Sequence, residues 1–119
     1  MDAVTVRHDD ELERDYGKWV LVRRSLGVHS FGINAVELQP GDSIPEHDEL
    51  DRAHEELFLV LEGTPTLVAD GAEHALRPGS YARLEPEPKR TVRNDGAAVA
   101  RVLIVSAPVT SGYEPMDWA

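Results

Sequence analysis

The stretch that decides the fold runs from Gly41 to Gly63 and reads GDSIPEHDELDRAHEELFLVLEG. It begins at the turn signal Pro40-Gly41 and ends in an apolar run, LFLVL at residues 57–61, which Gly63 closes. Between the turn and the run lies a polar segment rich in histidine and glutamate. We therefore expect two strands that flank a polar loop, with any chemistry beginning in that loop.

Four side chains of this polar segment are candidate ligands for a divalent metal ion. Residues two apart on an extended chain point to the same face, which pairs His47 with Glu49 and His54 with Glu56. Imidazole nitrogens and carboxylate oxygens bind zinc, manganese or iron, and a strand pair can present several of them toward one point. The alternative is that each of them is an ordinary solvated residue near a turn.

The spacing of the segment resembles the first motif of the cupin family, Gly-x5-His-x-His-x3,4-Glu-x6-Gly. Its matching positions are Gly41, His47, Glu56 and Gly63. The family's second histidine falls on Glu49, and the segment from there to Glu56 is longer than usual. The resemblance covers residues 35 to 106 and implies an all-β fold, an antiparallel double-stranded β-helix or jelly-roll barrel (cupin-like).

A second cupin motif, Gly-x5-Pro-x-Gly-x2-His-x3-Asn, follows further along the chain. Gly79 and Asn94 match its first and last positions, and Arg90 stands where the family places its last metal-binding histidine. In a cupin-like barrel the side chain of Arg90 would point inward, near His47 and Glu56. The resemblance specifies fold more than activity, because cupins range from dioxygenases and isomerases to proteins without known catalysis.

Composition and charge indicate one acidic domain. The chain has 119 residues, no cysteine and a formal net charge of -10. This charge opposes attraction to nucleic acid or to an anionic membrane surface, so neither partner is expected. The lack of cysteine excludes disulfides and thiolate metal sites. Since the sequence contains neither a signal-peptide core nor a run of membrane-spanning length, we expect a cytoplasmic protein.

Short strands separated by turns occupy the rest of the chain, a pattern typical of an antiparallel sandwich or barrel. Their expected ranges are 19–22, 28–38, 66–69, 73–76, 80–84, 89–93 and 99–106. The dipeptide Asp70-Gly71 predicts a type I′ hairpin, because both central residues of that turn need a positive φ. Gly32 indicates a bulge or a close approach within its strand.

Alternation along the apolar run assigns its side chains to two faces. Phe58 and Val60 share the parity of Glu56 and should line the barrel interior. The opposite face is expected to be equally buried, as in a strand covered on both sides. It should hold Leu57, Leu59 and Leu61.

We expect three segments: a polar arm, a cupin-like barrel and a tail, at residues 1–17, 18–108 and 109–119. In the arm, Val4 to Val6 is a candidate edge strand. The tail carries Tyr113, Met116 and Trp118, so we expect it to pack onto the barrel or onto a partner. Open strand edges also need covering, which together with the cupin resemblance predicts a homodimer.

Other chemistries lack a sequence signal. The histidines outside the central stretch, His8, His29 and His74, match no ligand spacing and are expected at the surface. No serine lies in a strand-to-helix elbow, which argues against a nucleophile triad. Both glycine-rich phosphate loops, GxGxxG and GxxxxGK[ST], are absent from the sequence.

The first functional hypothesis is a metal-free binding barrel. Arg90 supplies the fixed positive charge, and a small polar or carboxylate-bearing ligand bridges Arg90 and His47, since the planar guanidinium fork suits a carboxylate. Asn34 sits in mid-strand, where an inward amide would touch the same ligand, although an outward polar position fits the sequence as well. The expected ligand-binding residues are His47, Glu56, Arg90, Phe58 and Asn34.

Two alternatives remain open. A metal-dependent oxygenase or isomerase would bind iron, manganese or zinc, with Arg90 opposing the ion. Its ligands would be His47, Glu49, Glu56 and also His54. In the third hypothesis Arg90 simply pairs with Glu56 or Glu49, which leaves a barrel with a polar plug and no ligand.

Overall fold

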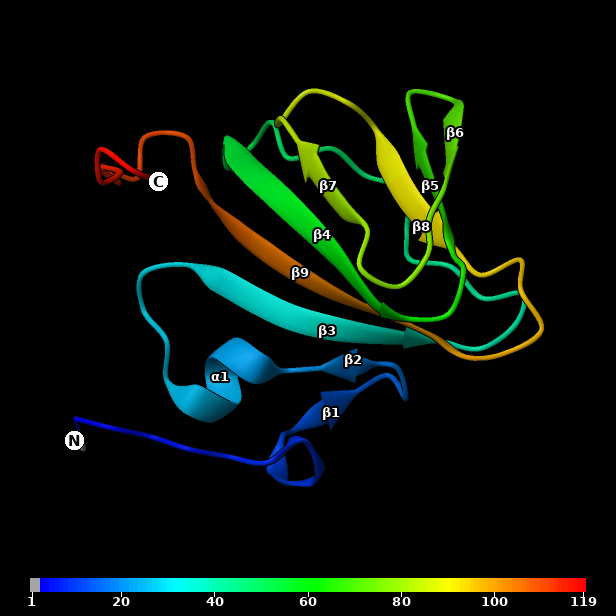
Figure 1. Ribbon diagram of the computed structural model, residues 1–119, viewed down its shortest axis with the longest axis horizontal. Coiled ribbons are helices and arrows are strands. Elements are labelled where there is room, and N and C mark those ends of the chain that lie inside the picture. Colours follow the sequence, from blue (N-terminus) through cyan, green and yellow to red (C-terminus); the bar gives the residue numbers. More distant parts are fainter. Residues whose placement is uncertain (1–2) are drawn as a thin grey trace.

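Two antiparallel sheets form the body of the protein in a computed structural model that describes residues 3–119 (Figure 1). Six strands make the larger sheet, in the order β1-β2-β3-β9-β4-β7, and three make the smaller, in the order β6-β5-β8. The predicted all-β jelly-roll architecture is confirmed. The elements are η1 (Asp9–Glu11), β1 (Arg14–Asp15), β2 (Trp19–Val20), α1 (Val22–Leu26), β3 (Gly32–Leu38), β4 (His54–Glu62), β5 (Thr66–Ala69), β6 (Ala72–Ala75), β7 (Tyr81–Leu84), β8 (Arg90–Arg93) and β9 (Ala100–Pro108).

The core fills the space between the sheets, and β4 gives it its largest apolar side chain. Phe58 is 0% exposed and Val60 is 1% exposed, on the same face as the buried Glu56. The predicted interior position of Phe58 and Val60 is therefore confirmed. The remaining core comes from both sheets and the segment before β4: Val36, Leu38, Ile44, Leu67, Leu84, Val92, Ala100 and Val102.

The opposite face of β4 is not buried, and this part of the prediction is wrong. Leu57 is 37% and Leu61 42% exposed, while Leu59 is half-buried. The apolar run alone does not reveal whether a second layer covers it. In this chain α1 packs against β3, where Val20 and Ala35 are buried beneath the N-terminal segments, but that layer does not extend over β4.

The region before β3 also differs from the sequence prediction. The strand expected at 19–22 ends at Val20, and α1 begins at Val22. β3 begins at Gly32 instead of residue 28. A helix of five residues is too short to leave a 3.6-residue pattern in the sequence. Val4 to Val6 forms no strand. β1 forms the edge of the larger sheet on this side, with β7 at the other edge, and Asp9 pairs with Arg101 of β9.

Two turn predictions are confirmed by the backbone. Asp70 and Gly71 have φ values of 48° and 79° and join β5 to β6, with Ala69 paired to Ala72 across the turn. Gly32 marks a close approach, because a Cβ at this position would lie 2.5 Å from the Oγ of Ser106. These local rules therefore place the hairpin and the β3–β9 contact correctly.

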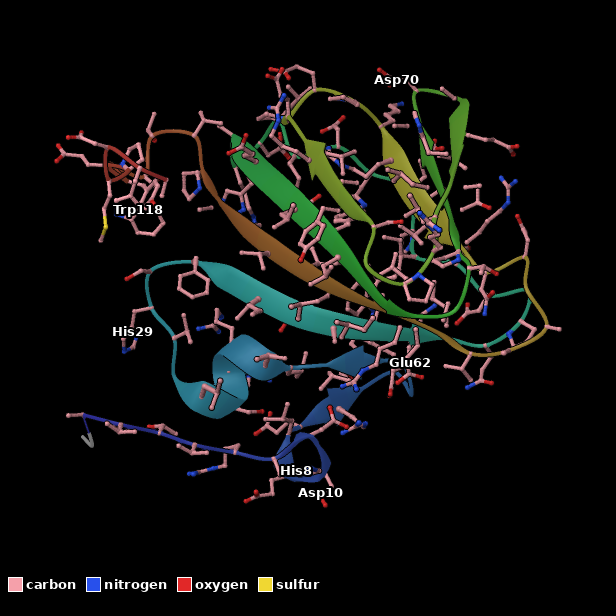
Figure 2. All side chains as sticks on the ribbon, viewed as in Figure 1. His8, Asp10, His29, Glu62, Asp70 and Trp118 are labelled. Carbon is pink, nitrogen blue, oxygen red and sulfur yellow. The ribbon has the colours of Figure 1, made fainter. Side chains whose placement is uncertain are left out.

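The chain after β9 leaves its large apolar side chains in solvent. Tyr113, Met116 and Trp118 are 78%, 66% and 84% exposed, and Figure 2 shows Trp118 away from the sheets, near the C-terminal end of the chain. Tyr113 borders a groove with Leu57 and Val105 of the barrel. The packing of the tail onto the barrel or onto a partner, like the homodimer, stays a prediction. Among the described residues, no helix combines the length and the apolar character that crossing a membrane requires.

Candidate functional site

Backbone pairing places His47 directly opposite Arg90. The His47 N–H donates to the Arg90 carbonyl at 3.0 Å, and the Arg90 N–H donates to the His47 carbonyl at 2.8 Å. The bridge between Ser43 and Arg93 continues this antiparallel pairing along β8. Because directly opposed residues of an antiparallel pair project to the same face, the His47 and Arg90 side chains emerge together.

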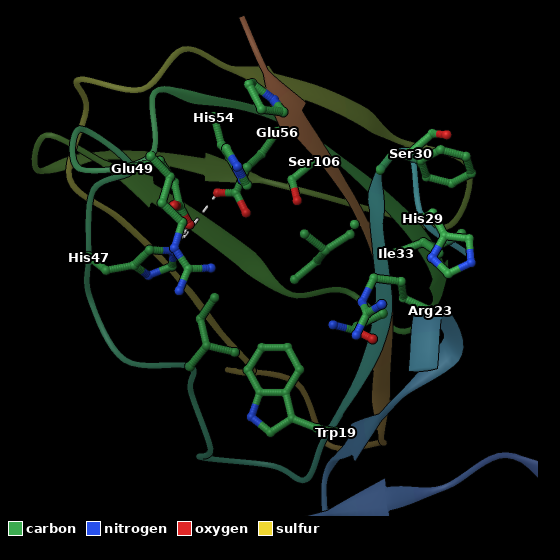
Figure 3. A pocket seen from close by; sticks show the side chains of 17 residues that line it. Trp19, Arg23, His29, Ser30, Ile33, His47, Glu49, His54, Glu56 and Ser106 are labelled. Atoms are coloured by element: carbon green, nitrogen blue, oxygen red, sulfur yellow. Dashed lines mark ion pairs between the residues drawn. The ribbon is translucent and has the colours of Figure 1, made fainter. Parts of the chain in front are cut away.

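Three of the four predicted metal ligands converge. The Nε2 atom of His47 lies 3.3 Å from Glu49 Oε1 and 3.8 Å from Glu56 Oε1. One donor atom from each of the three residues lies within 4.8 Å of the others, and Figure 3 shows the three side chains turned toward one another. His54 borders the same cavity but lies outside this cluster.

The long segment between the ligands, residues 48–53, folds into a compact turn and does not drive them apart. The Leu50 N–H donates to Asp48 Oδ1, and the Ala53 N–H donates to the Leu50 carbonyl at 3.2 Å. Ala53 has a φ of 51°, which directs the chain into β4. The segment also contributes Arg52 to the cavity border.

The hydrogen bond of His47 Nδ1 determines whether a neutral ring accepts or donates a hydrogen bond at Nε2. Nδ1 lies 2.8 Å from the carbonyl oxygen of Pro45, which can only accept, so Nδ1 carries a hydrogen. In a neutral ring Nε2 then presents a lone pair to the carboxylates of Glu49 and Glu56. Acceptors that face one another repel unless a proton or a metal cation lies between them. The cluster therefore requires at least one such positive charge.

Glu56 is the carboxyl best placed to hold a proton. Burial raises the pKa of Glu56, and the nearby Glu49 carboxylate raises it further, while Arg90 and His47 act to lower it. Glu56 Oε1 and Arg90 Nε are 3.3 Å apart, but the angle between them does not make a hydrogen bond, and neither atom has another hydrogen-bond partner. The Arg90 charge therefore lies against this oxygen without a hydrogen bond, which leaves the carboxyl oxygen available.

Arg90 is fully buried, and its terminal nitrogens bind the loop that precedes β8. Nη1 donates to the carbonyls of Pro86 and Pro88 at 3.2 and 2.7 Å, and Nη2 donates to the Glu85 carbonyl at 2.6 Å. The Arg90 side chain points inward and lies beside Glu56, as expected. A ligand would have to displace these loop carbonyls or Glu56 in order to reach the guanidinium.

A cavity of about 580 Å³ opens beside the cluster. Asn34 lines it from β3, on the same inward face as Val36 and Leu38, whereas Phe58 and Arg90 are fully buried and do not line it. The motifs do not predict several lining residues, because most of these come from β2, α1, β9 and the segments around them, and Arg52 comes from the turn inside the central stretch. Trp19 pairs with Val36 and shares its inward face, but this register is set by the fold and is not encoded in the motif spacing. The missed residues include Trp19, Arg23, His29, Arg52, Ile104 and Ser106.

The histidines outside the central stretch do not all lie on bare surface. His8 and His74 are exposed, as predicted. His29 is exposed too, yet it lines the cavity, and Figure 3 shows it beside Arg23. The sequence could not place it there, since the loop before β3 was predicted as strand.

The sequence and the fold together identify the family. Residues 34–106 match the family model of the Cupin domain. The chain therefore belongs to the cupin family. No curated protein matches the sequence.

Solved structures resemble the chain over most of its length. A sugar phosphate isomerase of the cupin superfamily from Silicibacter pomeroyi has a TM-score of 0.67 and 27% identity, over 76% of this chain and 59% of that one. A cupin protein from Bacteroides fragilis has a TM-score of 0.76 and 18% identity, over 95% and 94%. A predicted oxalate decarboxylase from Thermotoga maritima has a TM-score of 0.73 and 16% identity, over 88% and 100%. The chain thus spans just under three fifths of the length of the Silicibacter isomerase.

The family implies a metal centre, and the residues present fit it only at three positions. His47, Glu49 and Glu56 are suitable donors for iron, manganese or zinc. At the fourth position Arg90 brings a positive charge within 3.3 Å of one of those donors. At about 4 Å and an effective dielectric of about 20, a unit charge repels another by about 4 kcal/mol, and a divalent ion doubles this. The site therefore does not fit the family's four-donor centre.

Proposed function

We propose that the chain binds a small polar ligand in this cavity and presents to it a proton held among His47, Glu49 and Glu56. The proposal is carried by one observation, which is that His47 Nε2 faces the carboxyl groups of Glu49 and Glu56 at the cavity wall. A hydroxyl or carbonyl group of the ligand at this position would exchange hydrogen bonds or a proton with the cluster.

The surrounding residues have separate roles in this proposal. Asn34 offers an amide that can both donate to and accept from the ligand. Trp19 and Ile104 provide apolar wall. Arg90 acts through Glu56, because its charge lies against that carboxyl while its other nitrogens hold the loop before β8. Arg90 is thus a positioning residue, and the predicted direct bridge from Arg90 to a ligand is not part of the proposal.

A set of small sugars, keto acids and dicarboxylates provides the test. The unfolding temperature of the wild type should rise with at least one of them, and this rise should vanish in Glu49→Gln and His47→Gln. Glu55→Gln is the matched control, since Glu55 is the exposed neighbour of Glu56 and pairs with Arg83 on the other face of β4. A compound that stabilises all four proteins equally would contradict the proposal.

A second candidate is a metal-dependent oxygenase or isomerase. The convergence of three donors favours it, as does the likeness to a protein named as a sugar phosphate isomerase. An ion would take the place of the proton in the cluster. Metal content of protein purified without added metal separates the candidates, because stoichiometric iron, manganese or zinc supports the enzyme. A barrel that takes up neither metal nor ligand would fit the third hypothesis, the Arg90–Glu56 plug. The cytoplasmic location stays a prediction.

A further inference from the structure

Two arginines border the cavity without a carboxylate beside them. Arg23 lies on α1, and Arg52 lies in the turn between His47 and His54. Within residues 3–119, neither guanidinium has an acidic side chain at ion-pair distance. Arg23 Nη1 donates to the Val28 carbonyl at 3.2 Å. Because a guanidinium has five N–H donors, most of those of Arg23 stay available.

Within residues 3–119, Arg23 and Arg52 share the lack of an ion pair with Arg7, Arg77 and Lys89, but of these five only Arg23 and Arg52 line the cavity. The sequence has 22 acidic and 12 basic residues, so most basic groups find a carboxylate nearby. Those that do among the described residues are Arg14, Lys18, Arg24, Arg83, Arg90, Arg93 and Arg101. Around the cavity two arginines balance two glutamates, which gives a formal charge of zero against -10 for the whole chain. The cavity is thus far less negative than the rest of the protein.

The two carboxylates lie at one border of the cavity, with Arg52 in the same segment as Glu49, whereas Arg23 lies at another border. Figure 3 shows Arg23 with His29 and Ser30 on one side, and the carboxylates of Glu49 and Glu56 on the other. A ligand that spans this space would meet cationic donors at one end and the proton-holding cluster at the other. An anionic substituent would be attracted most strongly to the Arg23 end, because the Glu49 and Glu56 carboxylates offset the charge of Arg52 at the other end.

We propose that the cavity takes a small molecule with an oxyanion, which is either a phosphate or a carboxylate group. Arg23 binds this group at the exposed border of the cavity, here called the rim. Arg52 adds positive charge from the turn at residues 48–53. The inference rests on the proposed function and names the class of its ligand. A guanidinium matches either oxyanion through paired N–H groups. The rest of the ligand carries the polar group that reaches His47 and Glu49.

The experiment uses nuclear magnetic resonance of the ¹⁵N-labelled protein at constant ionic strength. Inorganic phosphate and acetate probe the oxyanion alone, and glucose 6-phosphate, gluconate and glucose probe the two-ended ligand. We expect phosphate or acetate to shift the amides of residues 29–32, and the matching sugar derivative to bind about tenfold more tightly than glucose. Hydrogen bonds to a charged group contribute about 1.5 kcal/mol at the lower end, which is about tenfold in affinity.

Substitutions assign the effect to the rim. Arg23→Gln should weaken anion binding about tenfold, and Arg52→Gln should weaken it less. Two controls remove the same charge outside the cavity and should leave binding unchanged. Arg24→Gln changes the next residue of α1, and Arg77→Gln changes a residue away from the cavity. Absence of anion binding at millimolar concentrations, or an equal loss in all four variants, would overturn the inference.

The outcomes keep the two proposals apart. Anion binding that depends on Arg23 while no ligand responds to Glu49→Gln would support the rim and overturn the proposed function. A ligand that depends on Glu49 but not on Arg23 would support the cluster and overturn the rim. If phosphate binds and acetate does not, the ligand is a phosphate ester; the reverse identifies a carboxylic acid.

Discussion

Positive charge is paired at the floor of the cavity and unpaired at its rim. The floor comprises Glu56, Phe58 and Arg90, and the rim comprises Arg23, Phe31 and Arg52. At the floor, Arg90 is fully buried, and loop carbonyls and Glu56 surround its guanidinium. At the rim, Arg23 and Arg52 are exposed and have no carboxylate at ion-pair distance among the described residues. A buried charge must be satisfied inside the fold, whereas an exposed one remains available to a ligand. We therefore propose that the floor sets the geometry of the site and that the rim sets its selectivity.

The largest difference between the two regions is expected for their arginines. Arg90→Ala leaves Glu56 without its partner and several loop carbonyls unsatisfied, so it should lower the free energy of unfolding by about 3 to 5 kcal/mol. Arg23→Ala should change it by about 0.5 kcal/mol or less. Urea unfolding at neutral pH measures both. A loss below about 1 kcal/mol for Arg90→Ala would mean that its burial is dispensable.

Aromatic side chains sharpen the same comparison. Phe58 is 0% exposed in the core, two residues along β4 from Glu56, and Phe31 is 42% exposed at the cavity border. Phe58→Ala should therefore destabilise by about 3 to 5 kcal/mol, because it leaves a void in the core. Phe31→Ala should cost about 1 kcal/mol or less. If the two variants unfold at equal urea concentrations, the division into floor and rim fails.

The smallest effect concerns the pH dependence of stability. The pKa of Glu56 is raised above its usual 4.5 in the folded protein, chiefly by burial. The folded state thus holds this proton more tightly than the unfolded state, and the stability it contributes below pH 4.5 is lost as pH rises through the folded pKa. Glu56→Gln cannot ionise and should not show this loss.

Unfolding measured between pH 4 and 8 tests this sign. Relative to the wild type, Glu56→Gln should gain stability as pH increases. The exposed Glu55→Gln is the control for the substitution itself and should follow the wild type across the range. A wild type that gains stability relative to Glu56→Gln as pH rises would show that the carboxylate of Glu56 is favoured in the fold.

Local rules of sequence were sufficient for the floor and insufficient for the rim. Motif spacing and strand parity place His47, Glu56 and Phe58, because these signals lie within one strand and the loop beside it. Arg23 and His29 reach the cavity from a short helix and an irregular loop, which have no periodic pattern. Their contact with the central stretch depends on the packing of distant segments, which spacing does not encode.

The same limit explains the error on the outer face of β4. Leu57 and Leu61 continue an apolar run, but burial requires a second layer, and the layer in this chain stops at β2 and β3. The sequence also did not indicate that the turn at residues 48–53 would keep Glu49 beside Glu56. Hydrogen bonds within the turn and from the Glu49 N–H to the Pro86 carbonyl provide that geometry.

Calorimetric titration with manganese and zinc tests the central claim, which is that a proton and Arg90 supply the positive charge of the floor. The wild type should bind either ion weakly. Arg90→His removes the opposing charge and adds an imidazole beside His47, Glu49 and Glu56, so its metal affinity should be at least about tenfold higher. Arg24→His, which adds the same group outside the cavity, should resemble the wild type. Tight binding by the wild type that Arg90→His weakens would contradict the account.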